Sequence, residues 1–369
     1  MAKFEIYKEL VIHLPNQEYP ITIGYNALQD PIILNRYLAG EQVLIVTNDK
    51  IASLYLSYLE RAFANRQCDV VILDDGEEFK NQESLFAIYD KLIATHHSRD
   101  TTLIALGGGV IGDITGFAAA TYQRGVQFVQ IPTTLLAQVD ASVGGKTAIN
   151  HPQAKNMIGS FYQPAAVIID LNTLKTLPMR EFRAGLAEVI KYALLTGGEF
   201  FKLVFHMLKE GMESTLSEDL AAVISHCCQI KASYVEQDQY EKSGQRAFLN
   251  LGHTFAHALE ACTHYSRWLH GEAVAIGLYC AALLSQQYAH LNAETVNLID
   301  EMLLMAKLPR RIPKDINLDE LQSAMLQDKK IKNKNLRFIL MKAVGDCYIE
   351  DNVPENLLRL ILEAAVEGD

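Results

Sequence analysis

The sequence predicts an α/β fold in which a Rossmann-like N-terminal domain with a parallel sheet precedes a mostly α-helical domain. Two observations predict this fold. Continuous apolar, β-branched runs recur in the first half, at residues 43–47, 70–74, 102–109, 128–132 and 166–170, and such runs suit strands that are buried on both faces. From about residue 180 onward, apolar residues instead recur at helical spacing. We therefore divide the chain at Pro178, into domains 1–178 and 179–369.

The elements follow in order along the chain. Residues 3–23, which begin KFEIYKELVIHL, predict an antiparallel hairpin added to the sheet. Longer amphipathic segments separate the strand runs and predict the helical crossovers that a parallel sheet requires. In the second half, segments 184–195, 219–235 and 253–262 predict helices.

Composition and charge exclude several classes of partner. The chain has 369 residues, of which 49% are hydrophobic, and a formal net charge of −11. Nucleic acids and membrane surfaces select for dense positive charge, so we expect neither as a partner. No apolar run reaches the roughly 18 residues that cross a bilayer. Charged residues interrupt the start of the chain at Lys3, Glu5 and Lys8, so we expect no signal peptide and a cytoplasmic location.

A glycine-rich segment, ALGGGVIGDITG, follows the third strand run. Its glycines, Gly107 to Gly109, stand between an apolar strand and a small-residue helix, where their backbone can approach a phosphate at the helix N-terminus. The spacing is not G-x-G-x-x-G, so the usual dinucleotide fingerprint is not matched. Tight packing of strand against helix is the alternative explanation.

A polar segment, residues 131–161, follows the fourth strand run. Lys146, Lys155 and Asn156 stand in glycine-containing segments that we expect to be turns, with Asp140 nearby, and could form an anion pocket. An isolated lysine is more often a solvated surface charge. The proximity of the glycine-rich segment favours the pocket.

The predicted helix 184–195 carries Glu188 and Lys191, three residues apart on one face. Such a pair can be a surface ion pair. Because apolar residues flank both, we expect the carboxylate and the ammonium to point inward toward a site.

Two histidines, His253 and His257, stand four residues apart in a predicted helix, the spacing of helical zinc sites. No glutamate follows His253, so the H-E-x-x-H pattern fails. His270 lies where another helix is expected to begin. Catalytic zinc commonly takes three protein ligands, and two imidazoles with a carboxylate would suffice. A hydrogen-bonded helix histidine is the alternative for each ring taken alone.

Six segments in this order resemble the 3-dehydroquinate synthase family of the sugar phosphate cyclase superfamily, and the resemblance runs along nearly the whole chain. They are GGGVIGDITGFAAATYQRG, IPTTLLAQVDASVGGKTAIN, KNMIGSFYQP, GLAEVIKYALL, RAFLNLGHTFAHALE and LHGEAVAIG. The resemblance implies an NAD-binding α/β domain, a helical domain, an active site in the cleft and a homodimer. It also implies that Glu188, His253 and His270 bind zinc, and that His257 lies over the substrate's phosphate.

The resemblance further assigns site residues one by one. The implied NAD-binding residues are Glu77, Lys80, Gly108, Gly109, Asp113, Thr133, Thr134, Asp140, Lys146 and Lys155. The implied catalytic residues are Lys191, Asp140, His257, Arg246 and Asn250. The implied substrate-binding residues are Arg124, Lys146, Lys155, Asn156, Lys231 and Lys330 or its neighbour Lys329, with Arg124 reaching the neighbouring subunit's site. In DQYEKSGQR, Gln239 replaces an acid of the family pattern and Glu241 is displaced by one residue, which leaves the role of Glu241 open.

The implied activity converts 3-deoxy-D-arabino-heptulosonate 7-phosphate to 3-dehydroquinate and phosphate, in the shikimate pathway, with NAD and zinc or cobalt as cofactors. Lys231 and Arg246 suit the carboxylate of this sugar phosphate. The alternatives are a related cyclase acting on sedoheptulose 7-phosphate, a metal-dependent polyol dehydrogenase, and a nucleotide-binding module without catalysis.

Overall fold

The computed structural model describes residues 4–211, 218–331 and 336–368, with side chains left undescribed in 327–331. The chain divides into two compact units. The first contains residues 1–177 and 215–240, and the second contains residues 178–214 and 241–369. Among the described residues, no helix is both long and apolar enough to cross a membrane.

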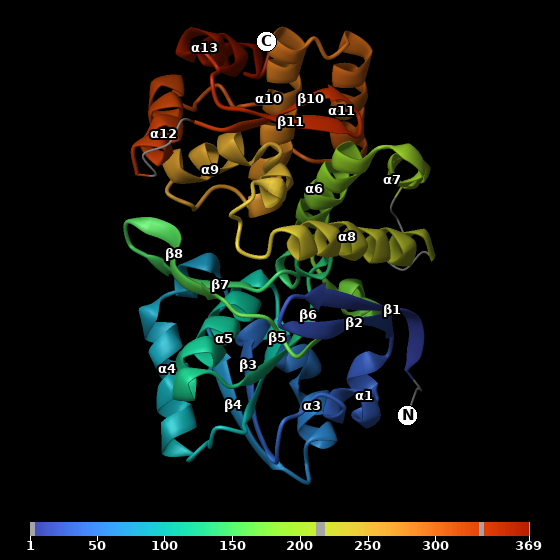
Figure 1. Ribbon diagram of the computed structural model, residues 1–369, viewed down its shortest axis with the longest axis vertical. Helices are drawn as coiled ribbons and strands as arrows, with labels where there is room; N and C mark the ends of the chain where they lie inside the picture. Colours follow the sequence, from blue (N-terminus) through green and yellow to red (C-terminus); the bar gives the residue numbers. More distant parts are fainter. Residues whose placement is uncertain (1–3, 212–217, 332–335, 369) are drawn as a thin grey trace. The chain divides into compact units, whose positions relative to one another are not determined.

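The first unit is built on a seven-stranded sheet (Figure 1). Its strands are β1 (Glu5–Leu14), β2 (Gln17–Tyr25), β3 (Gln42–Asn48), β4 (Gln67–Leu73), β5 (Thr102–Gly107), β6 (Gln127–Pro132) and β9 (Ala166–Asp170). They lie in the order β1-β2-β9-β6-β5-β3-β4. All neighbours are parallel except β1 and β2, which form the predicted hairpin at one edge. The five predicted strand runs are confirmed as β3, β4, β5, β6 and β9.

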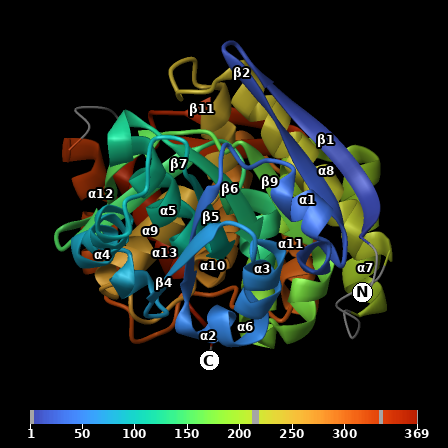
Figure 2. The same cartoon turned by 90° about the horizontal axis from the view of Figure 1, so that it is seen from below.

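The sheet is covered on both faces, as the continuous apolar runs predict. Its helices are α1 (Pro31–Asn35), α2 (Asp49–Ile51), α3 (Ser57–Ala62), α4 (Gln82–Ala94) and α5 (Gly109–Thr121). Along β3, Leu44 and Val46 pack with α4 and α5 in one core, whereas Val43 and Ile45 pack with α1 and α3 in the other. This alternation explains why no polar face is visible in the strand sequences. Figure 2 shows the two helical layers from below.

The order of the strands places the glycine-rich segment after β5 where sheets of this kind bind ligands. From β3 onward the order β4-β3-β5-β6-β9 is the doubly wound order 2-1-3-4-5. Connections reverse direction between β3 and β5, and ligands of such sheets bind beyond the carboxyl ends of the strands at this switch point. The glycine-rich segment at the end of β5 therefore stands at the expected binding position.

Two further elements complete the first unit. Strands β7 (Lys146–His151) and β8 (Ala154–Phe161) form an antiparallel ribbon, so Lys146, Lys155 and Asn156 lie on strands rather than in the turns expected from sequence. Helix α8 (Glu218–Gln237) also belongs here, although the division at Pro178 assigns it to the second domain. The reason is its packing: Glu236 Oε1 accepts from His13 N of β1 at 2.8 Å, and the Cys228 thiol donates to the Gln138 carbonyl at 3.2 Å.

The second unit is mostly helical, as predicted. Its helices are α6 (Met179–Thr196), α7 (Gly198–Glu210), α9 (His253–Cys262), α10 (His270–Ala289), α11 (Ala293–Met305), α12 (Leu318–Ile331) and α13 (Glu355–Ala364). Helix α10 is central, since it contacts α6, α9, α11 and α13. A hairpin of β10 (Phe338–Ala343) and β11 (Asp346–Glu350), which was not predicted from the sequence, also packs on α10.

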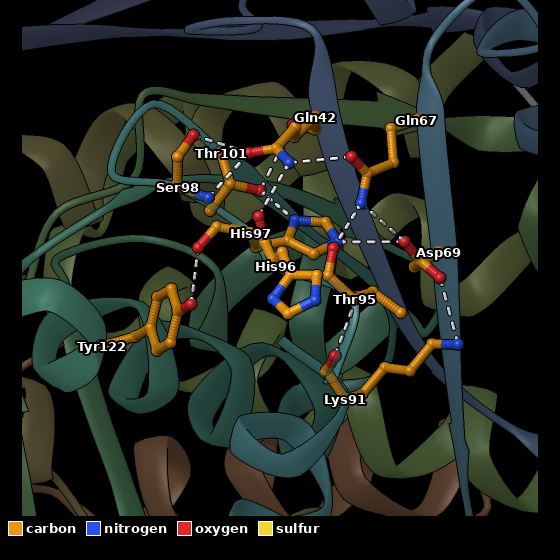
Figure 3. A network of polar contacts seen from close by, with 10 residues as sticks. All are labelled: Gln42, Gln67, Asp69, Lys91, Thr95, His96, His97, Ser98, Thr101 and Tyr122. Carbon is orange, nitrogen blue, oxygen red and sulfur yellow. Dashed lines mark hydrogen bonds and ion pairs between the residues drawn. The ribbon is translucent and has the colours of Figure 1, made fainter. Parts of the chain in front are cut away.

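A polar network connects side chains at the amino-terminal ends of the strands, at the opposite end of β5 from the glycine-rich segment (Figure 3). The buried His97 ring lies between Asp69 Oδ2, 3.1 Å from Nε2, and Thr101 Oγ1, 2.7 Å from Nδ1. Lys91 Nζ of α4 lies 3.0 Å from Asp69 Oδ1. Burial alone would raise the pKa of Asp69, but its contacts with Lys91, Gln67 and His97 lower it below the ordinary value.

Asp69→Asn is expected to lower the free energy of unfolding at pH 7 by about 2 kcal/mol, because the buried His97 and the partly exposed Lys91 lose a charged acceptor. A carboxyl group whose pKa is lowered by folding stabilises the protein above its unfolded pKa and loses that contribution as pH falls through the folded value. The difference between wild type and variant should therefore be constant above about pH 5 and shrink below about pH 4. Urea unfolding across this range measures it. Asp90→Asn, an exposed carboxylate on α4, is the matched control and should change little at any pH.

Candidate functional site

The glycine-rich segment forms a close turn between β5 and α5. Helix α5 begins at Gly109, and its N-cap residue is Gly108, which leaves the first N–H groups without a side-chain cap. A Cβ atom on Gly108 would stand 3.1 Å from Thr134 Cγ2. Thr133 N donates to the Gly107 carbonyl at 3.0 Å, so the carboxyl ends of β5 and β6 are joined here. The turn thus has both the close packing and the open helix N-terminus that phosphate binding uses.

Residues predicted to bind cofactor or substrate, from three segments, meet beside this turn. The Lys80 ammonium is buried, contacts Asp113 of α5, and donates to Asn156 Oδ1 of β8 at 2.6 Å. Burial alone would lower the pKa of Lys80, but Asp113 and Glu77 raise it above the ordinary value. Lys155 Nζ lies 3.7 Å from Glu77 Oε1. The structure therefore brings Glu77, Lys80, Asp113, Lys155 and Asn156 into one connected group.

Asn150 of β7 connects the members of this group, a role that was not predicted from the sequence. Its amide donates to Glu77 Oε1 at 2.7 Å, its Oδ1 accepts from Asn156 N at 3.0 Å, and its backbone N donates to the Lys80 carbonyl at 2.7 Å. The only signal in the sequence was its position at the end of the segment GGKTAIN, which by itself does not distinguish a network residue from a strand residue.

Asp140 and Lys231 also meet within the first unit. Lys231 Nζ of α8 lies 3.0 Å from Asp140 Oδ2 and donates to the Asp140 carbonyl at 2.6 Å. Lys231 is buried. The two residues are 91 positions apart in the sequence, so the sequence gave no indication that they pair. Their contact also helps to explain why α8 packs with the first unit.

Two predicted site residues, Arg124 and Asn156, and Glu241, whose role the sequence leaves open, have left-handed backbone conformations. Arg124 has φ 66°, Asn156 has φ 56° and Glu241 has φ 56°. Such conformations are uncommon outside glycine and are concentrated at functional sites. Arg124 and Lys146 have exposed side chains.

In the second unit, the Glu188 and Lys191 side chains point inward, as predicted. Both lie on α6, with exposed fractions of 0% and 1%, and Lys191 Nζ contacts Glu188 Oε2. Two charges at these exposures are costly in a helical core unless they serve a site or are well paired. A surface ion pair, the alternative explanation for these two residues, is therefore excluded.

His253 and His270 face the other oxygen of the same carboxylate. The Nε2 atom of each ring lies 3.6 Å from Glu188 Oε1. These three ligand atoms all lie within 4.8 Å of one another. A tetrahedral zinc ion with bonds of about 2.1 Å separates its ligand atoms by about 3.4 Å, so a carboxylate and two imidazoles at these distances fit a divalent cation.

The electrostatics of the two rings differ. Burial lowers the pKa of His253 to about 3, so its ring is neutral at pH 7. Burial alone would also lower the pKa of His270, but Glu188 and Glu260 raise it to about 10. The two carboxylates beside the His270 ring thus stabilise positive charge at this position.

His257 does not join this group. Among the described residues, the cluster able to hold a metal contains Glu188, His253 and His270. The His257 side chain is exposed, and its ring centroid lies 5.5 Å from that of His253. The spacing of four residues places His253 and His257 on the same face of α9, but only His253 belongs to the group of possible metal ligands.

Of the remaining predicted residues, Arg246 and Asn250 lie in the segment before α9, and Lys329 and Lys330 belong to α12. Arg246 is 1% exposed, and its Nε lies 3.5 Å from Glu241 Oε1. Asn250 is exposed. The Lys329 and Lys330 side chains lie outside the described residues. The contact with Arg246 gives Glu241, whose role the sequence left open, a specific partner.

The fold is that of the sugar phosphate cyclases. The chain is similar to the solved structure of 2-epi-5-epi-valiolone synthase from Streptomyces hygroscopicus subsp. jinggangensis 5008, which has NAD⁺ and Zn²⁺ bound, with a TM-score of 0.88 and 26% identity over 96% of this chain and 98% of that one. The family descriptions 3-dehydroquinate synthase N-terminal and C-terminal match residues 70–184 and 185–331.

Two curated relatives identify the branch within this class. A 3-dehydroquinate synthase of Legionella pneumophila (strain Paris) is 61% identical over 100% of both chains, and one of Coxiella burnetii (strain CbuK_Q154) is 52% identical over 95% of this chain and 98% of the relative. This chain belongs to the 3-dehydroquinate synthase family.

Proposed function

We propose that this enzyme converts 3-deoxy-D-arabino-heptulosonate 7-phosphate to 3-dehydroquinate and inorganic phosphate, as a carbon–oxygen lyase of the shikimate pathway. The observation that carries the proposal is the convergence of Glu188, His253 and His270, at ligand distances, in a chain 61% identical to a 3-dehydroquinate synthase. A nucleotide-binding module without catalysis would have no use for this cluster.

The cofactors are NAD and one divalent cation, zinc or cobalt, since both metals accept a carboxylate and two imidazoles. The first unit offers NAD the glycine turn with Gly108, Gly109, Thr133 and Thr134, and the second offers the cation its three ligands. When bound, NAD supplies reversible oxidation of a secondary alcohol of the substrate, and the cation supplies positive charge beside that alcohol.

Residues of this chain position the substrate and move its protons. Lys191, which contacts Glu188, is assigned to hold a substrate hydroxyl and to relay its proton. Asp140, held by Lys231, is assigned the same task for a neighbouring hydroxyl. The departing phosphate can itself accept the proton lost on elimination, so no dedicated base is assigned. Return of the hydride to the substrate, ring opening and intramolecular aldol closure then complete the product.

The cations match a substrate with two anionic groups. Six residues are assigned to the phosphate: Lys146, Lys155, Asn156, Asn250, His257 and Arg124. Lys231 and Arg246 are assigned to the carboxylate, Arg246 through the two parallel donors of its guanidinium. This explains why a chain of net charge −11 carries so many cations at its predicted site positions. Arg124 is assigned to the site of a neighbouring subunit, in a homodimer.

Purified enzyme supplied with NAD and zinc is expected to release phosphate from the heptulosonate phosphate without accumulating NADH, because the hydride returns to the substrate within each turnover. Phosphate release and absorbance at the NADH band, followed together, measure this. Steady growth of NADH without phosphate would instead establish a polyol dehydrogenase.

A second candidate substrate is sedoheptulose 7-phosphate, and the likeness to 2-epi-5-epi-valiolone synthase is the observation that favours testing it. This sugar phosphate has no carboxylate. With Arg246 and Lys231 in place, kcat/KM is expected to be higher for the heptulosonate phosphate. A higher value for sedoheptulose 7-phosphate would reassign the chain within the superfamily.

A further inference from the structure

Glu260 is a buried carboxylate beside the three-residue cluster. It lies on α9, seven residues after His253, and is 4% exposed. On a helix, residues 253, 257 and 260 share one face, so α9 presents two histidines and this glutamate on the same side. Burial of an ionised carboxylate is costly unless a charged or polar partner compensates for it.

One partner of Glu260 is His270. Glu260 Oε1 lies 3.5 Å from His270 Nδ1, while Nε2 of the same ring lies 3.6 Å from Glu188 Oε1. The imidazole is therefore placed between two carboxylates, one at each ring nitrogen. Because Glu260 accepts at Nδ1, the proton of a neutral ring stays on that nitrogen, and the lone pair of Nε2 faces the cation position.

His253 has the corresponding arrangement with a backbone acceptor. Its Nδ1 lies 3.2 Å from the Leu251 carbonyl, and its Nε2 lies 3.6 Å from Glu188 Oε1. Both rings thus direct Nε2 toward one carboxylate oxygen and Nδ1 toward an acceptor. Metal-binding histidines commonly have such an acceptor on the distal nitrogen, and its loss typically costs 10- to 100-fold in metal affinity.

We propose that Glu260 is a positioning residue of the metal site, which orients the His270 ring and adds a second negative charge near the cation. This inference rests on the proposed metal site. It assigns Glu260 no contact with substrate: its effect is exerted through His270.

The test measures zinc affinity rather than activity. Wild-type enzyme, Glu260→Gln and Glu260→Ala are stripped of metal and titrated with Zn²⁺ in competition with a chromophoric chelator. Glu260→Ala is expected to weaken zinc binding about 30-fold. Glu260→Gln, which keeps an acceptor oxygen but loses the charge, is expected to weaken it about 5- to 10-fold. The visible spectrum of the Co²⁺-loaded Ala variant should also change, because the ligand ring is no longer held.

Asp300→Asn is the matched control. Asp300 pairs with Arg310 and Arg311 elsewhere in the same unit, so its loss removes a carboxylate without touching the cluster and should leave zinc affinity unchanged. If Glu260→Ala fails to fold, the zinc affinity of Glu260→Gln by itself tests the proposal.

Zinc affinity of folded Glu260→Gln within twofold of wild type would overturn the positioning role while leaving the metal site intact. Absence of zinc binding by the wild-type enzyme would instead overturn the proposed function itself.

Discussion

His270→Ala is expected to lose both bound zinc and turnover while keeping NAD affinity. Removal of one of three ligands leaves Glu188 and His253, too few to hold a catalytic cation firmly. Positive charge at the reacting oxygen contributes several kcal/mol, so a loss of about 4 kcal/mol, or roughly a thousandfold in kcat, is expected. Metal content after dialysis, NAD titration and phosphate release measure the three quantities.

His257→Ala is the matched control, since it removes an imidazole from the same face of α9. It should keep its zinc, because His257 lies outside the group of ligand atoms, and lose activity only through weaker phosphate binding. Zinc lost from His257→Ala but kept by His270→Ala would show that the ligand assignment is wrong.

Arg246→Lys is expected to lower kcat/KM for the heptulosonate phosphate about 100-fold, mainly through KM. Lysine keeps the charge, so the buried position beside Glu241 remains compensated, but the bidentate grip on a carboxylate is lost. Such a loss of a desolvated, charge-assisted contact costs about 3 kcal/mol. Steady-state kinetics over a range of substrate concentrations separate KM from kcat.

Two comparisons make this test specific. Arg311→Lys alters an arginine of the same unit that pairs with Asp300 and stacks on Tyr279, and it should leave kcat/KM unchanged. Glu241→Gln tests whether the contact at 3.5 Å orients Arg246, with a loss of about fivefold expected. An unchanged KM in Arg246→Lys would contradict the assignment of Arg246 to the carboxylate.

Most of the fold could be predicted because its strands and helices have different periodicities. The runs at β3, β5 and β9 are continuous and apolar because both faces of the sheet are covered, and α6 and α9 show helical spacing. The β7–β8 ribbon could not be predicted this way, since polar site residues occupy strand positions. The hairpin of β10 and β11 was missed because it lies alone among helices.

Some residues of the candidate site could likewise be predicted from the sequence pattern, and others could not. Glu188 and Lys191 could be singled out because charges within an apolar helical pattern are conspicuous. The choice of His270 over His257 could not be made from spacing, because it depends on how α10 begins against α9, and the family resemblance supplied it. Asn150 and Glu260 were missed because each acts through a partner distant in sequence or on another helix.

The assignment of α8 to the first unit has a consequence for synthesis of the chain. The polypeptide passes between the units three times, near residues 177, 214 and 240. A fragment that stops at Pro178 would therefore leave Asp140 without Lys231 and strip the edge hairpin of its covering helix. During translation, the first unit can complete its core only after residue 240 has left the ribosome. By then α6 and α7 have already emerged, and they cannot pack into the second unit until α9 and α10 have been synthesised.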